Sequence, residues 1–249
     1  MDFTWLEYGR ILNCLKEHEY MVCDYKNYSN YPKSVILRHD VDVSLSKAYE
    51  MALFEKENNV TSTYFVLITG DMYNAFTRKN IEYIKKIQDL GHGIGLHFDE
   101  TVYPEDCDMV GMIEQEIFIM RHMLNVNVDS VSMHIPSQKT LEANYVIEGG
   151  NIVNSYSDVF FKEFKYVSDS AMRWREDIYS IIESEKYSKI HLLTHPIWYN
   201  ENNLSMWENI SKVLSNQARE SYENLGVHTV GVKEKRTLKE CLGEIYDRD

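Results

Sequence analysis

The sequence has few of the residues that separate domains or build cross-linked scaffolds. It contains 4 prolines, 11 glycines and 4 cysteines in 249 residues. The cysteines form no CxxC pair, so neither a zinc ribbon nor a dithiol redox site is expected, and we predict free thiols at Cys14, Cys23, Cys107 and Cys241. No linker rich in Pro, Gly or Ser and no internal repeat divides the chain, which predicts one domain over 1–249.

Positive charge and long apolar runs are also scarce. Lys and Arg number 26 against 39 Asp and Glu, a formal net charge of −13 that disfavours nucleic acid and anionic membranes as partners. No apolar run approaches the roughly 20 residues that span a bilayer. The first residues lack the basic and apolar segments of a signal peptide, which predicts a cytoplasmic location.

What the chain does contain is an alternation of short apolar runs with helical stretches. Helices are expected near 5–15, 45–58, 79–90 and 109–124, and Gly91 is the expected stop of the third. Strands are expected at 35–37, 63–67, 94–96, 129–133, 164–167, 190–193 and 227–232. This order predicts a parallel sheet with helices outside it, and about 250 residues is the usual length of one α/β barrel. The first helix is expected to pack on the outside.

Acidic and imidazole side chains directly follow four of the expected strands. These side chains are Asp40 and Asp42, His97 and Asp99, His134, and His195. The carboxyl ends of parallel barrel strands lie on one face, so the sequence predicts that these groups share a site.

The residue types suit a hydrolytic metal site. Of two nearby carboxylates, one can bind a cation while the other accepts a proton, although Asp42 is alternatively a cap for the helix starting near Ser44. His97 offers a neutral nitrogen, and Asp and His ligands with an open position are typical of zinc-like hydrolytic centres. His92 is expected to be structural.

The order of these motifs resembles the polysaccharide deacetylase family, carbohydrate esterases that include chitooligosaccharide and peptidoglycan deacetylases. The resemblance spans about 34–199 and looks closest to a divergent bacterial branch associated with surface polysaccharides. Arg38-His39-Asp40-Val41-Asp42 is similar to the first motif, Thr-Phe-Asp-Asp-Gly, which implies that Asp40 is the base and that Asp42 is a metal ligand. Residues 91–97 resemble the stretch that leads to the first ligand histidine, which implies this role for His97.

The sequence departs from the family where a second ligand histidine is expected four residues later, because this position is Thr101. The third ligand is then His134, where the family has Arg before Pro, or Asp99. Imidazole suits a borderline metal and favours His134.

The remaining motifs complete the pocket that the resemblance implies. Residues 169–174 are similar to the fourth motif, in which an acid tunes the base through an Arg and a Trp shapes the pocket, or they form an ordinary surface loop. Leu193-Thr194-His195 matches the fifth motif, whose His is the general acid. The pocket residues expected on these grounds, with aromatic faces for a sugar ring, are Arg38, Asp99, Asp169, Arg173, Trp174 and Trp198.

The resemblance implies a distorted, seven-stranded (β/α) barrel, here with an N-terminal helical extension, that hydrolyses amides with a divalent metal. The expected activity removes an N-acyl group, acetyl above all, from an amino sugar or its activated or lipid-linked precursor. Zinc is the expected metal, with cobalt, manganese and nickel as alternatives. Thr101 motivates a first rival, a metal-independent cyclic amide or ureide hydrolase of the allantoinase-like branch. A second rival is a catalytically silent carbohydrate-binding barrel.

Overall fold

The computed structural model describes residues 1–228 and 237–240, and the chain divides into two compact units, Met1–Asn203 and Leu204–Asp249. The first unit contains the sheet. The described part of the second contains helix α7 (Met206–His228). The strand expected at 227–232 is therefore not observed at 227 and 228, which belong to α7, and its other residues lie outside the described part.

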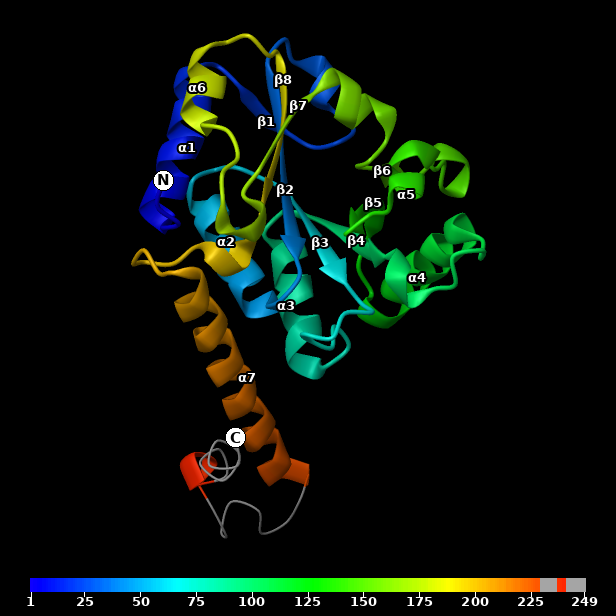
Figure 1. Cartoon of the computed structure of the whole chain (residues 1–249), viewed down its shortest axis with the longest axis vertical. Helices are drawn as coiled ribbons and strands as arrows, with labels where there is room; N and C mark the ends of the chain where they lie inside the picture. The colour runs from blue at the N-terminus through cyan, green and yellow to red at the C-terminus, as the bar shows by residue number, and fades with distance from the viewer. Residues whose placement is uncertain (229–236, 241–249) are drawn as a thin grey trace. The chain divides into compact units, whose positions relative to one another are not determined.

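The first unit is built on a parallel sheet. Its strands are β1 (Met21–Cys23), β2 (Ser34–Val41), β3 (Thr63–Leu67), β4 (Gly93–Asp99), β5 (Val128–His134), β6 (Val153–Asn154), β7 (Lys165–Ser168) and β8 (Lys189–Thr194). Seven of them follow the order β6-β5-β4-β3-β2-β8-β7, and β1 pairs with the start of β2. The predicted distorted (β/α) barrel is confirmed, since these seven parallel strands form a curled half-barrel with helices around it (Figure 1).

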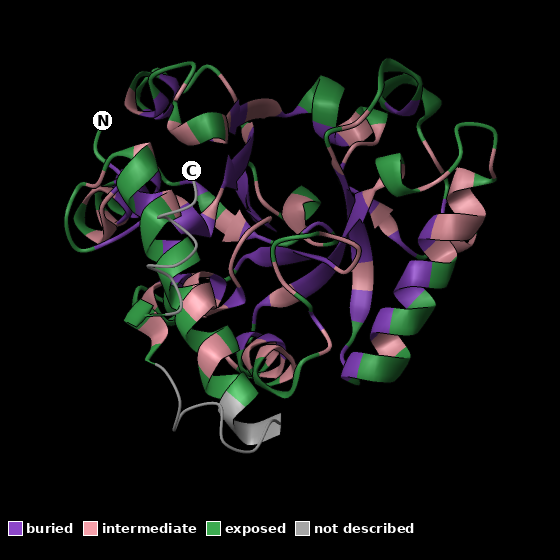
Figure 2. Cartoon of the chain, turned by 60° about the horizontal axis from the view of Figure 1, so that its bottom comes forward, coloured by how far each residue is buried: buried purple, intermediate pink, exposed green. Residues whose placement is uncertain are grey.

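Helices cover the outside of this sheet. They are α1 (Trp5–Glu17), α2 (Leu45–Glu57), α3 (Arg78–Asp89), α4 (Met109–Leu124), α5 (Gln138–Ala143) and α6 (Ile178–Glu183). The strands are largely buried, and the helices turn their exposed residues outward (Figure 2). Among the described helices, none is long and apolar enough to cross a membrane.

Local sequence explains where these helices begin and end. The Thr4 side chain caps α1 by accepting from the Glu7 N–H, and buried residues recur along α1 at Tyr8, Ile11, Leu12 and Leu15. The predicted N-terminal helix therefore packs through one face.

Two further helix ends are also explained by the local sequence. Ser44 caps α2 by accepting from the Lys47 N–H, so the alternative role of Asp42 as this cap is not observed. Gly91 has a φ of 99° just after α3, a left-handed conformation that suits glycine at a helix end.

The sheet separates two cores. All eight residues of β2 are buried, as expected for a parallel strand covered on both faces, and its side chains alternate between those faces. Arg38 and Asp40 face the barrel interior, where Phe65 and Gly95 also lie. A Cβ on Gly95 would come within 2.4 Å of the Phe65 ring, so glycine makes room for this aromatic side chain. His39 faces the helices.

Of the four cysteines, Cys14, Cys23 and Cys107 are free, as predicted, and Cys241 lies outside the described residues.

Candidate active site

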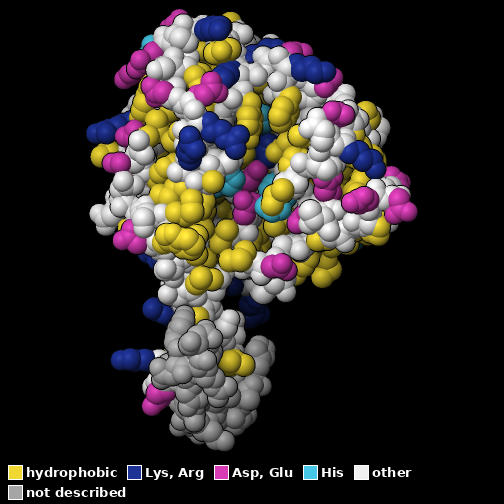
Figure 3. Space-filling model, in the orientation of Figure 1, with side chains coloured by type: hydrophobic (Ala, Val, Ile, Leu, Met, Phe, Trp, Pro, Cys, Tyr) yellow, Lys and Arg dark blue, Asp and Glu magenta, His cyan; other side chains and the backbone are white. Residues whose placement is uncertain are grey.

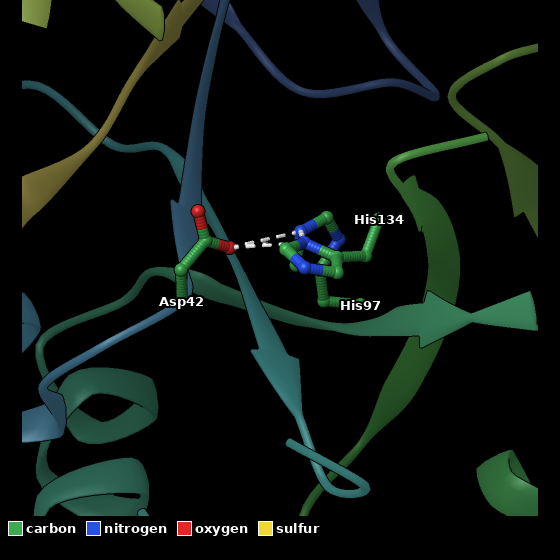
Figure 4. A group of neighbouring side chains, drawn as sticks. All are labelled: Asp42, His97 and His134. Carbon is green, nitrogen blue, oxygen red and sulfur yellow. Dashed lines mark hydrogen bonds and ion pairs between the residues drawn. The ribbon is translucent and has the colours of Figure 1, made fainter. Parts of the chain in front are cut away.

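Three ligand-type side chains meet at the carboxyl ends of the strands. Asp42 follows β2, His97 lies in β4 and His134 is the last residue of β5, and one ligand atom from each lies within 4.8 Å of the others (Figure 4). Asp42 Oδ1 is 3.1 Å from His97 Nε2 and 3.4 Å from His134 Nδ1, and the two nitrogens are 3.2 Å apart. We call these three residues the metal cluster.

The donor set of the metal cluster fits a divalent cation. Asp42 Oδ1 is buried and has no well-formed hydrogen bond among the described residues, although it faces two imidazole nitrogens. Ligand atoms at about 2.0–2.1 Å from a tetrahedral zinc ion lie roughly 3.3 Å apart, which matches the three observed separations. Burial acts to raise the pKa of Asp42, but His134 and His97 outweigh it and hold the pKa well below its ordinary value.

Ser132 orients one of the imidazoles. Its Oγ accepts from the Arg38 guanidinium, which can only donate, and lies 3.2 Å from His97 Nδ1. The hydroxyl can also accept from Nδ1, and we assign the His97 proton to Nδ1 because metal binding through Nε2 requires that nitrogen to be unprotonated. This tautomer leaves the lone pair of Nε2 directed at Asp42 and His134.

Asp40 lies beside the metal cluster and is held from within its own strand. Arg38 donates from Nε to Oδ1 at 2.8 Å and from Nη2 to Oδ2 at 2.7 Å, a bidentate pair in which both side chains are buried. Burial acts to raise the pKa of Asp40, but the guanidinium outweighs it, and the pKa lies below its ordinary value. Asp40 is therefore ionised at neutral pH, with Oδ2 3.6 Å from His97 Nε2.

His195, which directly follows β8, faces the same point. Its Nδ1 is 2.6 Å from Oδ1 of Asp169, a fully buried carboxylate that also accepts from the Tyr199 hydroxyl. Burial acts to lower the pKa of His195, but Asp169 outweighs it and raises the pKa to about 9. With this raised pKa the ring is doubly protonated at neutral pH, so Nδ1 donates to Asp169 and Nε2 carries the second proton, 3.7 Å from Asp42 Oδ2.

The surroundings of these groups form an apolar rim. Acidic and histidine side chains lie at the bottom of a hollow between apolar side chains, with basic side chains at one edge (Figure 3). Trp174 and Trp198 are half-buried against the core, and Trp198 Nε1 has no hydrogen-bond partner in the described part of the chain. Tyr199 is buried, so it is a core residue.

Two loops beside the site hold residues in left-handed backbone conformations. Ile135, directly after His134, has a φ of 42° and is 73% exposed. Ala171 and Met172, which follow Asp169, have φ values of 56° and 54°. A β-branched residue in this region is strained, and such strain tends to occur at functional sites.

A comparison of the sequence with protein-family models finds no match, and a comparison with curated proteins finds none either. Solved structures similar to this chain include a family 4 carbohydrate esterase from Streptococcus mutans, 17% identical, with a TM-score of 0.48 over 81% of this chain and 86% of that one. One from Bacillus anthracis is 15% identical, with a TM-score of 0.41 over 84% and 86%. A pseudoenzyme of this family from Bacillus anthracis is 13% identical, with a TM-score of 0.43 over 75% and 63%. These structures belong to the family of carbohydrate esterases that the sequence motifs resemble.

The structure shows where the residues that depart from the polysaccharide deacetylase motifs lie. Thr101 is exposed and donates its hydroxyl to Asp99, which thereby caps the turn after β4 and stays out of the metal cluster. His134 lies in the cluster instead. The guanidinium beside Asp40 comes from Arg38, whereas Arg173 is exposed and its backbone N–H donates to the Asp169 carbonyl.

Some residues that shape this site were not predicted from the sequence. Ser132 lies two residues before His134 in β5, and a strand's period of two places both on one face, which is the signal that points to it. Tyr156, whose ring lies 4.8 Å from the Arg38 guanidinium carbon, has no comparable local signal.

Proposed function

We propose that the protein is a metal-dependent hydrolase that removes an N-acyl group, acetyl above all, from an amino sugar or its activated or lipid-linked precursor. The observation that carries this proposal is the convergence of the metal cluster with an ionised carboxylate and a protonated imidazole. The family resemblance supports the choice of an N-acylated sugar. Zinc as the metal and a cytoplasmic location stay predictions.

Each group has a defined part in amide hydrolysis. Asp42, His97 and His134 would hold a divalent cation, which would supply Lewis acidity for an amide carbonyl and lower the pKa of a water molecule. Asp40 accepts the proton of the attacking water at Oδ2, the oxygen nearer the metal cluster. Arg38 keeps Asp40 ionised and fixes the direction of its lone pairs.

His195 completes the reaction as general acid. When the carbon–nitrogen bond breaks, the leaving nitrogen must take up a proton, and His195 gives it from Nε2. The Asp169 carboxylate stabilises the protonated ring before transfer and fixes its orientation. The products are the free amine of the sugar and the acid of the acyl group.

The proposal is tested by assaying the zinc, cobalt, manganese and nickel forms on a panel of N-acylated amino sugars. We expect release of the acyl group, and we expect Asp40→Asn to lower kcat by about 10²–10⁴-fold, the usual contribution of a general base. Asp40→Asn should retain one metal ion per chain because Asp40 is outside the ligand set. The absence of acyl release in every metal form would overturn the proposal.

The same experiment separates the rivals. Turnover that survives complete removal of metal would favour the metal-independent cyclic amide hydrolase. Equal sugar binding by the parent and Asp40→Asn, with no turnover by either, would favour a silent carbohydrate-binding barrel.

A further inference from the structure

A buried carboxylate lies on the opposite face of β2 from the metal cluster. Glu55 in α2 is fully buried and accepts from the hydroxyls of Tyr8 at 2.6 Å, Tyr64 at 2.7 Å and Ser62 at 2.5 Å, while His39 Nε2 lies at 2.8 Å. These four contacts fill the lone pairs of the carboxylate. We use the name Glu55 network for Glu55, Tyr8, Tyr64, Ser62, His39, Thr194 and His92.

His39 on β2 links Glu55 to Thr194 on the neighbouring strand β8. Its second ring nitrogen, Nδ1, lies 2.7 Å from the Thr194 hydroxyl on β8. In the sheet register His39 pairs with Tyr64 on β3 and with Thr194 on β8. The three side chains therefore form one row on the helix-facing side of the sheet, with Glu55 packed over it.

This row lies where the pairing of β2 with β8 ends. His39 and Thr194 are the last paired residues of the two strands. The next residues are Asp40 and His195, and after His195 the chain turns into the 3-10 helix Pro196–Trp198. The hydrogen bond between His39 and Thr194 is thus the last side-chain link across the two strands before the proposed base and acid.

We propose that Glu55, through His39 and Thr194, holds the ends of β2 and β8 so that Asp40 and His195 face one substrate. Glu55, His39 and Thr194 are positioning residues, because none of them touches the substrate. His39 acts through Asp40, which follows it in β2, and Thr194 acts through His195, which follows it at the end of β8. The inference rests on the proposed function for the roles of Asp40 and His195. A buried polar network is often less stabilising than apolar packing of the same volume, so stability alone does not explain it. A positioning role does explain why it lies at the row directly before Asp40 and His195.

A matched pair of variants separates positioning from stabilisation. Thr194→Val keeps the shape of the side chain and removes the link between β2 and β8. Tyr64→Phe removes a hydrogen bond of similar size from Glu55 in the same row and leaves that link intact. Both proteins should lose similar thermal stability.

The readouts are steady-state kinetics on the best N-acylated sugar and amide hydrogen exchange. We expect Thr194→Val to lower kcat about 10–100-fold with little change in KM, as for a small misplacement of reacting groups. Exchange should speed up at the amides of 39–42 and 193–195 in this variant. Tyr64→Phe should keep kcat within about threefold and leave exchange at both strand ends unchanged.

Two further results bear on the inference. Glu55→Gln, which cannot accept from all four partners, should share the kinetic and exchange effects of Thr194→Val. Equal effects of Thr194→Val and Tyr64→Phe, in proportion to lost stability, would overturn the positioning role. If the parent protein turns over no sugar, the proposed function fails, and exchange at the two strand ends alone decides whether the network positions them.

Discussion

The metal cluster and the Glu55 network each combine one carboxylate with two imidazoles, on opposite faces of the same strand. In the Glu55 network the carboxylate is filled by hydrogen bonds, and the ring nitrogens of His92 contact the Ser62 N–H and the Ala52 carbonyl. In the metal cluster one carboxylate oxygen has no hydrogen bond, and the Asp42 and His134 side chains are 28% and 20% exposed. Residue type alone therefore does not make a metal site. What distinguishes the metal cluster is a carboxylate oxygen without a well-formed hydrogen bond in the described residues, beside two imidazole nitrogens.

The largest expected effect tests which of the two groups binds metal. Asp42→Asn should lose stoichiometric zinc, with an affinity reduced by more than about 100-fold, because even an outer partner of a metal ligand is worth 10–100-fold. Glu55→Gln is the matched change in the other group and should retain one zinc per chain. Metal content after dialysis and calorimetric titration measure both.

The control for that comparison is Asp40→Asn, an acid-to-amide change beside the metal cluster. If Asp40→Asn and Asp42→Asn lost metal equally, general charge rather than ligation would explain binding. If Glu55→Gln lost it as well, the contrast between the two groups would not hold.

The next largest effect concerns stability of the metal-free protein. Glu55→Ala should lower the free energy of unfolding by about 3–5 kcal/mol, because it leaves several buried partners unpaired. Asp42→Ala should lower it by less than Glu55→Ala does, since Asp42 is partly exposed and faces two imidazoles, whereas Glu55 is fully buried and has four hydrogen-bond partners. Urea unfolding followed by circular dichroism measures both, and equal losses would contradict the prediction.

The Glu55 network should also contribute to stability in a pH-dependent way. Burial acts to raise the pKa of Glu55, but His39, His92 and Ser62 outweigh it and lower the pKa from 4.5 to about 2. A lowered carboxyl pKa stabilises the fold above the unfolded value, and this contribution disappears as the pH falls through the folded value. We expect about 3 kcal/mol to be lost between roughly pH 4.5 and pH 2.

Unfolding free energies of the parent and Glu55→Gln across acidic pH measure that contribution. The advantage of the parent should be constant from neutral pH to about pH 5 and should shrink below about pH 4.5. A difference between the two proteins that did not depend on pH would show that Glu55 is not ionised in the fold.

The sequence predicted the elements whose signals are local. The helix expected at 109–124 has those bounds in the structure, and the strand expected at 63–67 does too. The strands β1 and β6 have three and two residues, too few for a periodic pattern, and their pairing with distant strands defines them. Short edge elements of this kind lack a local signal.

The residues of the site likewise include some that the sequence predicts and some that only distant contacts define. The strand-end positions of Asp42, His97 and His134 follow from barrel topology, so the sequence placed them at one end. Which groups pair with each other did not follow. Asp169, which follows β7, forms a hydrogen bond with His195, which follows β8. The helical pattern predicts that Glu55 is solvated, but Glu55 is buried and accepts hydrogen bonds from other elements of the fold.

The smallest expected effect concerns backbone strain, which occurs beside the metal cluster but not within the Glu55 network in the described chain. Ile135→Gly should raise the free energy of unfolding by about 1 kcal/mol, because glycine adopts the left-handed φ of 42° without strain. Val146→Gly, another exposed β-branched site, has no such φ and should lose about 0.5–1 kcal/mol. Zinc affinity should weaken in Ile135→Gly alone, because freeing the backbone after His134 loosens a ligand. Urea unfolding and zinc titration measure the pair, and a destabilised Ile135→Gly would mean that the loop stores no strain.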